Sequence, residues 1–236
     1  MRRYISLYTF IGLLGLIAVF VGFARTFILP VANGTFQAPS IIYIHGAFTF
    51  GWVALFFVQA ALIKAENWRL HMILGSLGII IALGTAFTIP FAGAYQVEKD
   101  LANGLGDTAI STILGTVTAP IIYLCLVAAG LIKRRVPDVH KRLMLLATIA
   151  VLWPAWFRFR HYFPSVPNPE IWFAFVLADS LILISWIWDK RENGRVHPVL
   201  LCIGSLLIAE HAFEIAAFDS GPWRIVAQHI YSQFLP

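Results

Sequence analysis

Seven apolar segments, each long enough to cross a lipid bilayer, constrain this chain more than any other feature. A transmembrane helix needs roughly 20 mostly apolar residues. The segments that meet this requirement are Tyr4–Phe27, Ile41–Ile63, Leu70–Ala92, Thr108–Ile132, Val139–Phe157, Ile171–Trp188 and Pro198–Phe218. The connections between them are short and leave no room for a separate soluble domain. The sequence therefore predicts an all-α bundle of seven transmembrane helices, forming a single domain over residues 1–236.

The composition excludes the other broad classes of protein. Only 12% of the residues are charged and 59% are hydrophobic, whereas a soluble domain carries about 25% charged residues. A soluble globular domain, a disordered chain and a coiled coil are excluded. The two cysteines, Cys125 and Cys202, lie inside apolar segments, so a disulfide framework is excluded as well.

The lysines and arginines predict the orientation of the bundle. If the N-terminus is inside, the inner side carries twelve of the seventeen basic residues: Arg2, Arg3, Lys64, Arg69, Lys133, Arg134, Arg135, Lys141, Arg142, Lys190, Arg191 and Arg195. The outer side carries the other five: Arg25, Lys99, Arg158, Arg160 and Arg224. Basic residues concentrate on the cytoplasmic side of membrane proteins, which predicts an inner N-terminus and an outer C-terminus. Topology thus explains the net charge of +5, and the expected partner is the lipid bilayer rather than nucleic acid.

A short stretch of the sequence is repeated. Ala60–His71 and Ala129–His140 align without a gap and share Ala, Leu, Ile, Lys and His at equivalent positions. The similarity arises either by chance or from a parallel repeat of two helical hairpins, made of segments two and three and of segments four and five. A repeat would place His71 and His140 at the same depth, each at the inner start of a helix.

The end of the chain has the pattern of an amphipathic helix. Pro222 suits the first turn of a helix. The apolar residues that follow at helical spacing are Trp223, Val226, Ile230 and Phe234. Residues 222–234 are therefore expected to form a short helix lying on the outer membrane surface.

His71 and His140 form the first candidate site. Two imidazoles from neighbouring helices can be the axial ligands of a haem b, and the nearby basic residues Arg69, Lys141 and Arg142 could meet its propionates. Such a protein would transfer electrons or sense redox state. The alternative is that a histidine among basic residues at a helix start contacts lipid phosphate or hydrogen-bonds a loop.

A second candidate site lies in the outer half of the predicted bundle. This outer group consists of His45, His161, Glu210, His211 and Glu214, and its candidate metal ligands are His45, Glu210, His211 and Glu214. Glu210 and Glu214 are four residues apart, and His211 and Glu214 three apart, so they can be neighbours on one helix. Such a set could bind a divalent metal or relay protons. In the alternative interpretation, Glu210 or Glu214 forms a structural ion pair with Arg158 or Arg160.

Asp179 lies close to the middle of the sixth segment. A lone carboxylate at that depth is costly unless it is neutral or paired. We expect it to face the interior of the bundle and to hydrogen-bond a polar group such as Gln59. It would then be either a proton relay or an inert buried acid.

Four strings of the sequence are familiar in combination: His45–Trp52 continuing to Phe56–Gln59, Arg69–Gly75, Pro137–Thr148 and Gly194–Pro198. Together they resemble a widespread, mostly uncharacterised group of bacterial seven-helix membrane proteins, over nearly the whole chain. The resemblance implies the fold and a location in the bacterial cytoplasmic membrane, and no activity. The group often has a basic residue after the histidine that matches His71, where this chain has Met72.

Three functions are compatible with these features. The first is a haem- or metal-binding protein for electron transfer or redox sensing. The second is a small proton-coupled transporter that uses Asp179, Glu210 and Glu214. The third is an accessory subunit without a catalytic site, bound to another membrane protein or to a second copy of itself. The residues do not decide whether the protein is an enzyme.

Overall fold

The computed structural model describes residues 5–234 of the chain. Tyr4, the predicted start of the first span, lies outside the described residues, as do the predicted inner-side residues Arg2 and Arg3. Every regular element between residues 5 and 234 is helical. Seven helices are long and apolar enough to cross a membrane, so the predicted all-α bundle of seven spans is confirmed.

The seven spans agree with the predicted segments, but three of them change helical type along their length. The first span combines α1 (Leu7–Phe23), the π-helical η1 (Ala24–Ile28) and α2 (Leu29–Ala32). The next three spans are α3 (Ser40–Lys64), α4 (Trp68–Ala102), and α5 (Asp107–Ser111) with α6 (Ile113–Ile132). The fifth combines α7 (Pro137–Val151), α8 (Trp153–Phe157) and the 3-10 turn η2 (Arg158–His161). The last two are the π-helical η3 (Glu170–Leu177) with α9 (Ala178–Asn193), and α10 (Pro198–Ala217).

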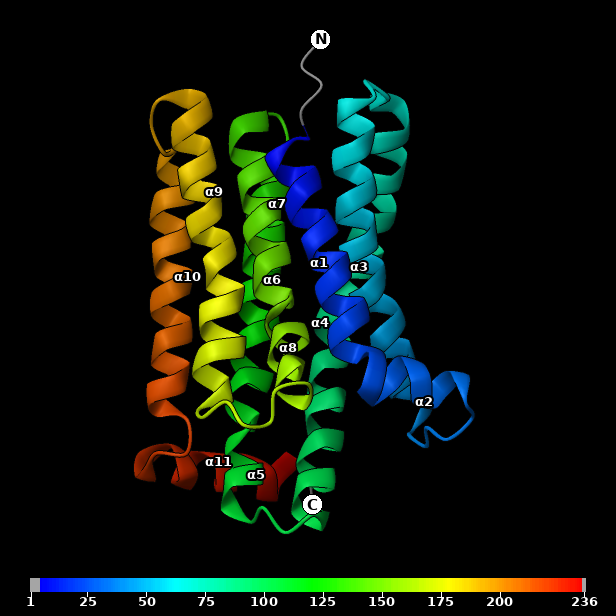
Figure 1. The fold of residues 1–236 in the computed structure, drawn as a ribbon, viewed down its shortest axis with the longest axis vertical. Helices are drawn as coiled ribbons and strands as arrows, with labels where there is room; N and C mark the ends of the chain where they lie inside the picture. The colour runs from blue at the N-terminus through cyan, green and yellow to red at the C-terminus, as the bar shows by residue number, and fades with distance from the viewer. Residues whose placement is uncertain (1–4, 235–236) are drawn as a thin grey trace.

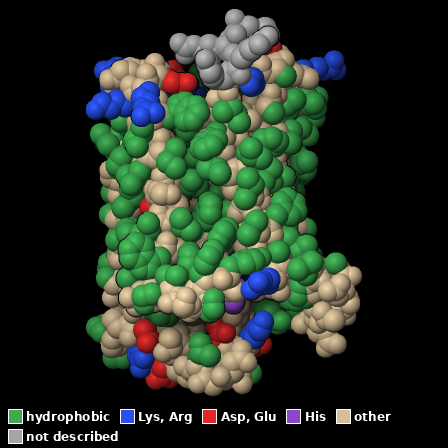
Figure 2. Space-filling model, in the orientation of Figure 1, with side chains coloured by type: hydrophobic (Ala, Val, Ile, Leu, Met, Phe, Trp, Pro, Cys, Tyr) green, Lys and Arg blue, Asp and Glu red, His purple; other side chains and the backbone are tan. Residues whose placement is uncertain are grey.

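The helices run up and down in an antiparallel bundle (Figure 1). The links α3–α4, α6–α7 and α9–α10 lie at the same end as the start of α1. We call this the basic end, because most lysines and arginines lie in or beside these links. The opposite end is called the distal end. In Figure 2 hydrophobic side chains cover the middle of the molecule, and charged side chains gather above and below this band.

Packing within the bundle follows the two predicted hairpins. α3 packs along α4, and α6 packs along α7. α7 is the central helix, since it also contacts α1, α3, α9 and α10. Its side chains Leu145, Leu146 and Ile149 are fully buried. Large apolar side chains such as Phe87 and Phe213, with exposed fractions of 68% and 65%, point outward, where a bilayer would cover them.

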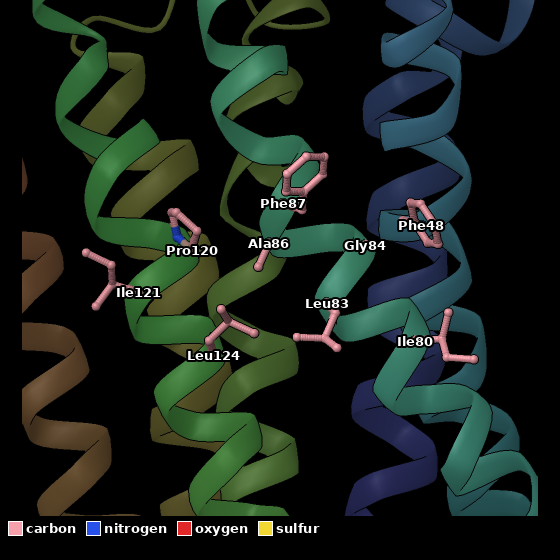
Figure 3. Close-up of a pocket in the computed structure, with 9 residues that line it drawn as sticks. All are labelled: Phe48, Ile80, Leu83, Gly84, Ala86, Phe87, Pro120, Ile121 and Leu124. Atoms are coloured by element: carbon pink, nitrogen blue, oxygen red, sulfur yellow. The ribbon is translucent and has the colours of Figure 1, made fainter. Parts of the chain in front are cut away.

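α4 is longer than expected and is bent. The prediction ended at Ala92, whereas the helix continues to Ala102, because polar residues beyond the hydrocarbon core can extend a transmembrane helix. Pro90 lies inside it and cannot donate the backbone hydrogen bond to Ala86. Figure 3 shows the ribbon turning aside at Gly84–Ala86. The turn leaves an apolar groove of about 670 Å³, whose lining residues are Phe48, Ile80, Leu83, Gly84, Ala86, Phe87, Pro120, Ile121 and Leu124.

The last described element is α11 (Gly221–Phe234), which lies across the distal end of the bundle beside α5 (Figure 1). Asp219 holds its start: the carboxylate accepts hydrogen bonds from Thr108, Ser111 and Arg224 at 2.6–3.0 Å. The Arg224 guanidinium lowers the pKa of Asp219 to about 2. That α11 lies on a membrane surface stays a prediction.

Candidate functional site

A histidine and a carboxylate meet inside the distal half of the bundle. Nδ1 of His211, on α10, is 2.8 Å from Oδ1 of Asp179, on α9. Both residues are buried, with exposed fractions of 6% and 5%. The Trp153 ring lies beside the imidazole, with 6.0 Å between ring centroids. The interior position expected for Asp179 is therefore found, and its partner is His211 rather than Gln59.

Two glutamates of α10 extend this polar group toward the distal end. Nε2 of His211 is 3.8 Å from Oε2 of Glu210. Glu214 lies one turn further along the same face, next to Glu210. Its carboxylate accepts a hydrogen bond from the hydroxyl of Thr118, on α6. We call Asp179, Glu210, His211 and Glu214 the Asp179–His211 cluster.

Two oxygens of this cluster are buried and have no hydrogen-bond partner among the described residues. They are Oδ2 of Asp179 and Oε1 of Glu210. A buried oxygen without a partner is costly when it carries charge. Each of these two atoms can therefore accept a hydrogen bond that the described residues do not supply.

His45 does not extend this cluster. Its Nδ1 is 2.9 Å from the hydroxyl of Thr88, so it bonds across α3 and α4, whereas His211 bonds across α9 and α10. Within residues 5–234, no three His, Cys, Asp or Glu side chains are arranged so that they could hold a metal ion. The divalent-metal site thus stays a prediction from the sequence.

The arginine pairing considered for the two glutamates is absent from the described part of the chain. Arg158 donates to the backbone oxygen of Pro154, and Arg160 donates to that of Phe157. The carboxylates of Glu210 and Glu214 face His211 and Thr118 instead. Since no guanidinium compensates these acids, a purely structural ion pair does not account for them.

His71 and His140 occupy corresponding places at the basic end, because each is the fourth residue of its helix. Nδ1 of His140 donates to the backbone oxygen of Gly130 at 2.8 Å. Nδ1 of His71 is buried and has no hydrogen-bond partner among residues 5–234. The side-chain amide of Gln59 donates to the backbone oxygen of His71 at 3.1 Å, so Gln59 belongs to this end of the bundle rather than to Asp179.

Two of the three basic residues near these histidines are already paired. Arg142 is buried and forms an ion pair with Asp189 of α9. Lys141 forms one with Asp138, one turn earlier in α7. Arg69, by contrast, is exposed. If a haem bound to His71 and His140, Arg69 would be the one basic residue of this group that has no carboxylate partner among the described residues.

Three residues of these polar groups were not identified from the sequence. Thr118 and Trp153 face the Asp179–His211 cluster, and Asp189 pairs with Arg142. Thr118 and Trp153 have no individual sequence signal, because threonine and tryptophan are common in membrane helices. Asp189 did have one: it follows the apolar run directly, and an acid so close to the membrane interior needs a partner.

The apolar groove of Figure 3 is not part of either polar group. Its lining residues come from α3, α4 and α6, and none of them is titratable.

The chain matches no known family model, no curated protein and no solved structure. The function is therefore inferred from the geometry of the polar groups alone.

Proposed function

We propose that this integral membrane protein transports protons, with the Asp179–His211 cluster as its proton-binding site. The observation that most supports this proposal is the 2.8 Å contact between His211 Nδ1 and Asp179 Oδ1 in the buried interior of the bundle. Ionisable groups at this depth are rare in membrane proteins and mark ion or proton pathways. The basic end would face the cytoplasm of a bacterial cell.

The His211–Asp179 contact accommodates two protonation arrangements with little movement. Either a protonated His211 donates to the Asp179 carboxylate, or a protonated Asp179 donates to the neutral imidazole. Both arrangements keep the hydrogen bond and differ only in the position of one proton. The second oxygen of Asp179, which lacks a partner among the described residues, is the atom at which a proton can enter or leave.

The glutamates supply the next positions of the pathway. The 3.8 Å separation between His211 Nε2 and Glu210 Oε2 is longer than a hydrogen bond, and one water molecule or a small rotation would close it. Glu210 and Glu214 then lead toward the distal end along α10, with Thr118 orienting the last carboxylate.

Proteoliposomes that contain a trapped pH-sensitive dye test this proposal. A potassium gradient with valinomycin makes the interior negative, and we expect protein-dependent acidification of the interior. Asp179→Asn keeps the shape of the side chain and removes its charge, so it should abolish this flux. Ser185→Ala on the same helix, which loses only a hydrogen bond to the Leu181 carbonyl, should retain it. Equal flux from Asp179→Asn and the wild type would contradict the proposal.

A haem at the basic end is a second candidate function, favoured by one observation. Because Nδ1 of His140 donates to the Gly130 carbonyl, its Nε2 is unprotonated in the neutral ring and free to bind a metal. His71 has a buried ring nitrogen that no described residue contacts by a hydrogen bond. These two residues would be the axial ligands of a haem b that carries electrons.

The visible spectrum of the purified protein tests this second function. We expect a Soret band that shifts on reduction, and its loss in both His71→Ala and His140→Ala. Absence of the band after expression with added haem precursor would exclude haem and leave the proton-transport proposal unaffected.

A further inference from the structure

Three arginines converge at the distal end, where the positive-inside rule disfavours basic residues. Arg25 belongs to η1, and Arg158 and Arg160 belong to η2. We call these three residues the distal arginine cluster. The charges of all three act on His161 together with that of Lys99. In Figure 2, Lys or Arg side chains lie beside a His side chain just above the lower end.

Close packing of α1 against α8 brings the cluster together. A Cβ atom on Gly22 would collide with the backbone oxygen of Ala155, so only glycine allows this approach. Arg25 follows three residues later, in a π-helical turn, a feature often found at functional sites. Its Nη1 donates to the backbone oxygen of His161 at 2.8 Å, which joins the first span to the fifth.

The arginines are held by neutral groups. Each guanidinium packs over an aromatic ring, with 4.3, 4.1 and 3.7 Å to the ring centroids. The rings belong to Tyr162, Phe23 and Phe157, in that order. Each guanidinium also donates one hydrogen bond to a backbone oxygen.

Within the described residues, none of the three arginines is ion-paired with a carboxylate. The charge of one acid, Asp100, reaches Arg160. That carboxylate is itself hydrogen-bonded to Gln96 at 2.9 Å. A guanidinium has five N–H donors, so each arginine keeps donors for a ligand.

We propose that the distal arginine cluster binds a phosphate group at the membrane surface. Arg25 lies in the π-helical part of the first span, and Arg158 and Arg160 lie at the end of the fifth, so we expect the cluster to lie at the depth of lipid headgroups. Planar guanidinium groups bind phosphate oxygens in pairs and keep their charge when partly buried. The phosphate belongs either to an anionic lipid or to a soluble anion, and both present the same oxygens.

Two binding measurements separate these sources. Native mass spectrometry of the purified full-length protein measures retention of phosphatidylglycerol against phosphatidylcholine. Thermal unfolding in detergent compares sodium phosphate with sodium chloride at equal ionic strength. For the correct source, we expect Arg158→Gln/Arg160→Gln to weaken binding by roughly tenfold or more, because two charge-assisted hydrogen-bond donors are lost. Arg25→Gln should weaken binding of the same ligand. Because it is a single substitution at an exposed position, it tests the proposal even if the double variant misfolds.

A matched double variant, Arg134→Gln/Arg135→Gln, removes the same charge from the basic end. Arg134 also donates to the backbone oxygen three residues earlier, at 3.2 Å, as Arg160 does at 3.3 Å. This control should leave the binding unchanged. Binding of neither ligand, or equal weakening by the control and by the distal variants, would overturn the proposal.

Discussion

The guanidinium of Arg142 and the carboxylate of Asp189 form a buried ion pair that joins α7 to α9 at the basic end. Both side chains have exposed fractions of only 4%. The same carboxylate accepts hydrogen bonds from the Asn193 side chain and the His197 backbone amide, each at 2.7 Å. This pair therefore fixes the central helix of the bundle to the start of α10.

Removing one partner of this pair should strongly destabilise the protein. Asp189→Ala leaves the buried Arg142 guanidinium with only the exposed carboxylate of Asp138, 3.3 Å away, and breaking a buried pair costs about 3–5 kcal/mol. Denaturant unfolding of the purified protein in detergent measures the free energy of unfolding. Lys190→Ala, at the exposed neighbouring position, should change it little. Equal unfolding midpoints for the two variants would show that the pair does not hold the helices.

The contact between α1 and α8 gives a second stability prediction. Gly22→Ala places a methyl group against the Ala155 backbone oxygen, and overpacking of this kind costs about 1–3 kcal/mol. Gly51→Ala in α3 is the matched control, because its new methyl group would lie 3.9 Å from Ile81. In detergent, the melting temperature of Gly22→Ala should be well below those of the control and of the wild type. If the Gly22→Ala protein is as stable as the control, α1 and α8 do not pack as closely as described.

The helical segments were predictable because each depends on local sequence. A long apolar run specifies a membrane span whatever it packs against, so the seven spans follow from hydropathy alone. The interior position of Asp179 was also predictable, since a short acidic side chain at that depth has no favourable contact with lipid. These predictions need no knowledge of which helices are neighbours.

The side-chain pairs were not predictable, because each depends on which helices meet. Asp179 and His211 are 32 residues apart, and Arg142 and Asp189 are 47 apart. The sequence assigned Arg142 to a haem propionate and grouped His45 with His211. The depth of each residue could be estimated from its span, whereas its direction around the helix axis could not. The hydrogen bonds between Arg142 and Asp189 and between His45 and Thr88 depend on that direction.

The attachment of α11 should depend on pH. The Arg224 guanidinium lowers the pKa of Asp219 from 3.8 to about 2. A lowered pKa means that the ionised carboxylate stabilises the folded state above pH 3.8, and that this contribution is lost as the pH falls toward 2. Hydrogen exchange of α11, corrected for intrinsic rates, should therefore show constant protection from pH 7 to about pH 4 and lower protection near pH 2.

Asp219→Asn provides the comparison for this pH dependence. The variant cannot ionise, so its α11 should exchange faster than that of the wild type at neutral pH and should lose the dependence on acid. If the variant and the wild type exchange at the same rate at neutral pH, the Asp219 hydrogen bonds do not hold α11 in place.

Infrared difference spectroscopy of the protein in nanodiscs, recorded as a function of pH, tests the central claim most directly. A protonated carboxyl group has its own carbonyl band, which shifts in deuterated water. We expect such a band to change with pH in the wild type, and to be reduced in both Asp179→Asn and Glu210→Gln but not in Ser185→Ala. A spectrum without a pH-dependent carboxyl band, or one that neither carboxyl variant alters, would contradict a proton-binding role for the Asp179–His211 cluster.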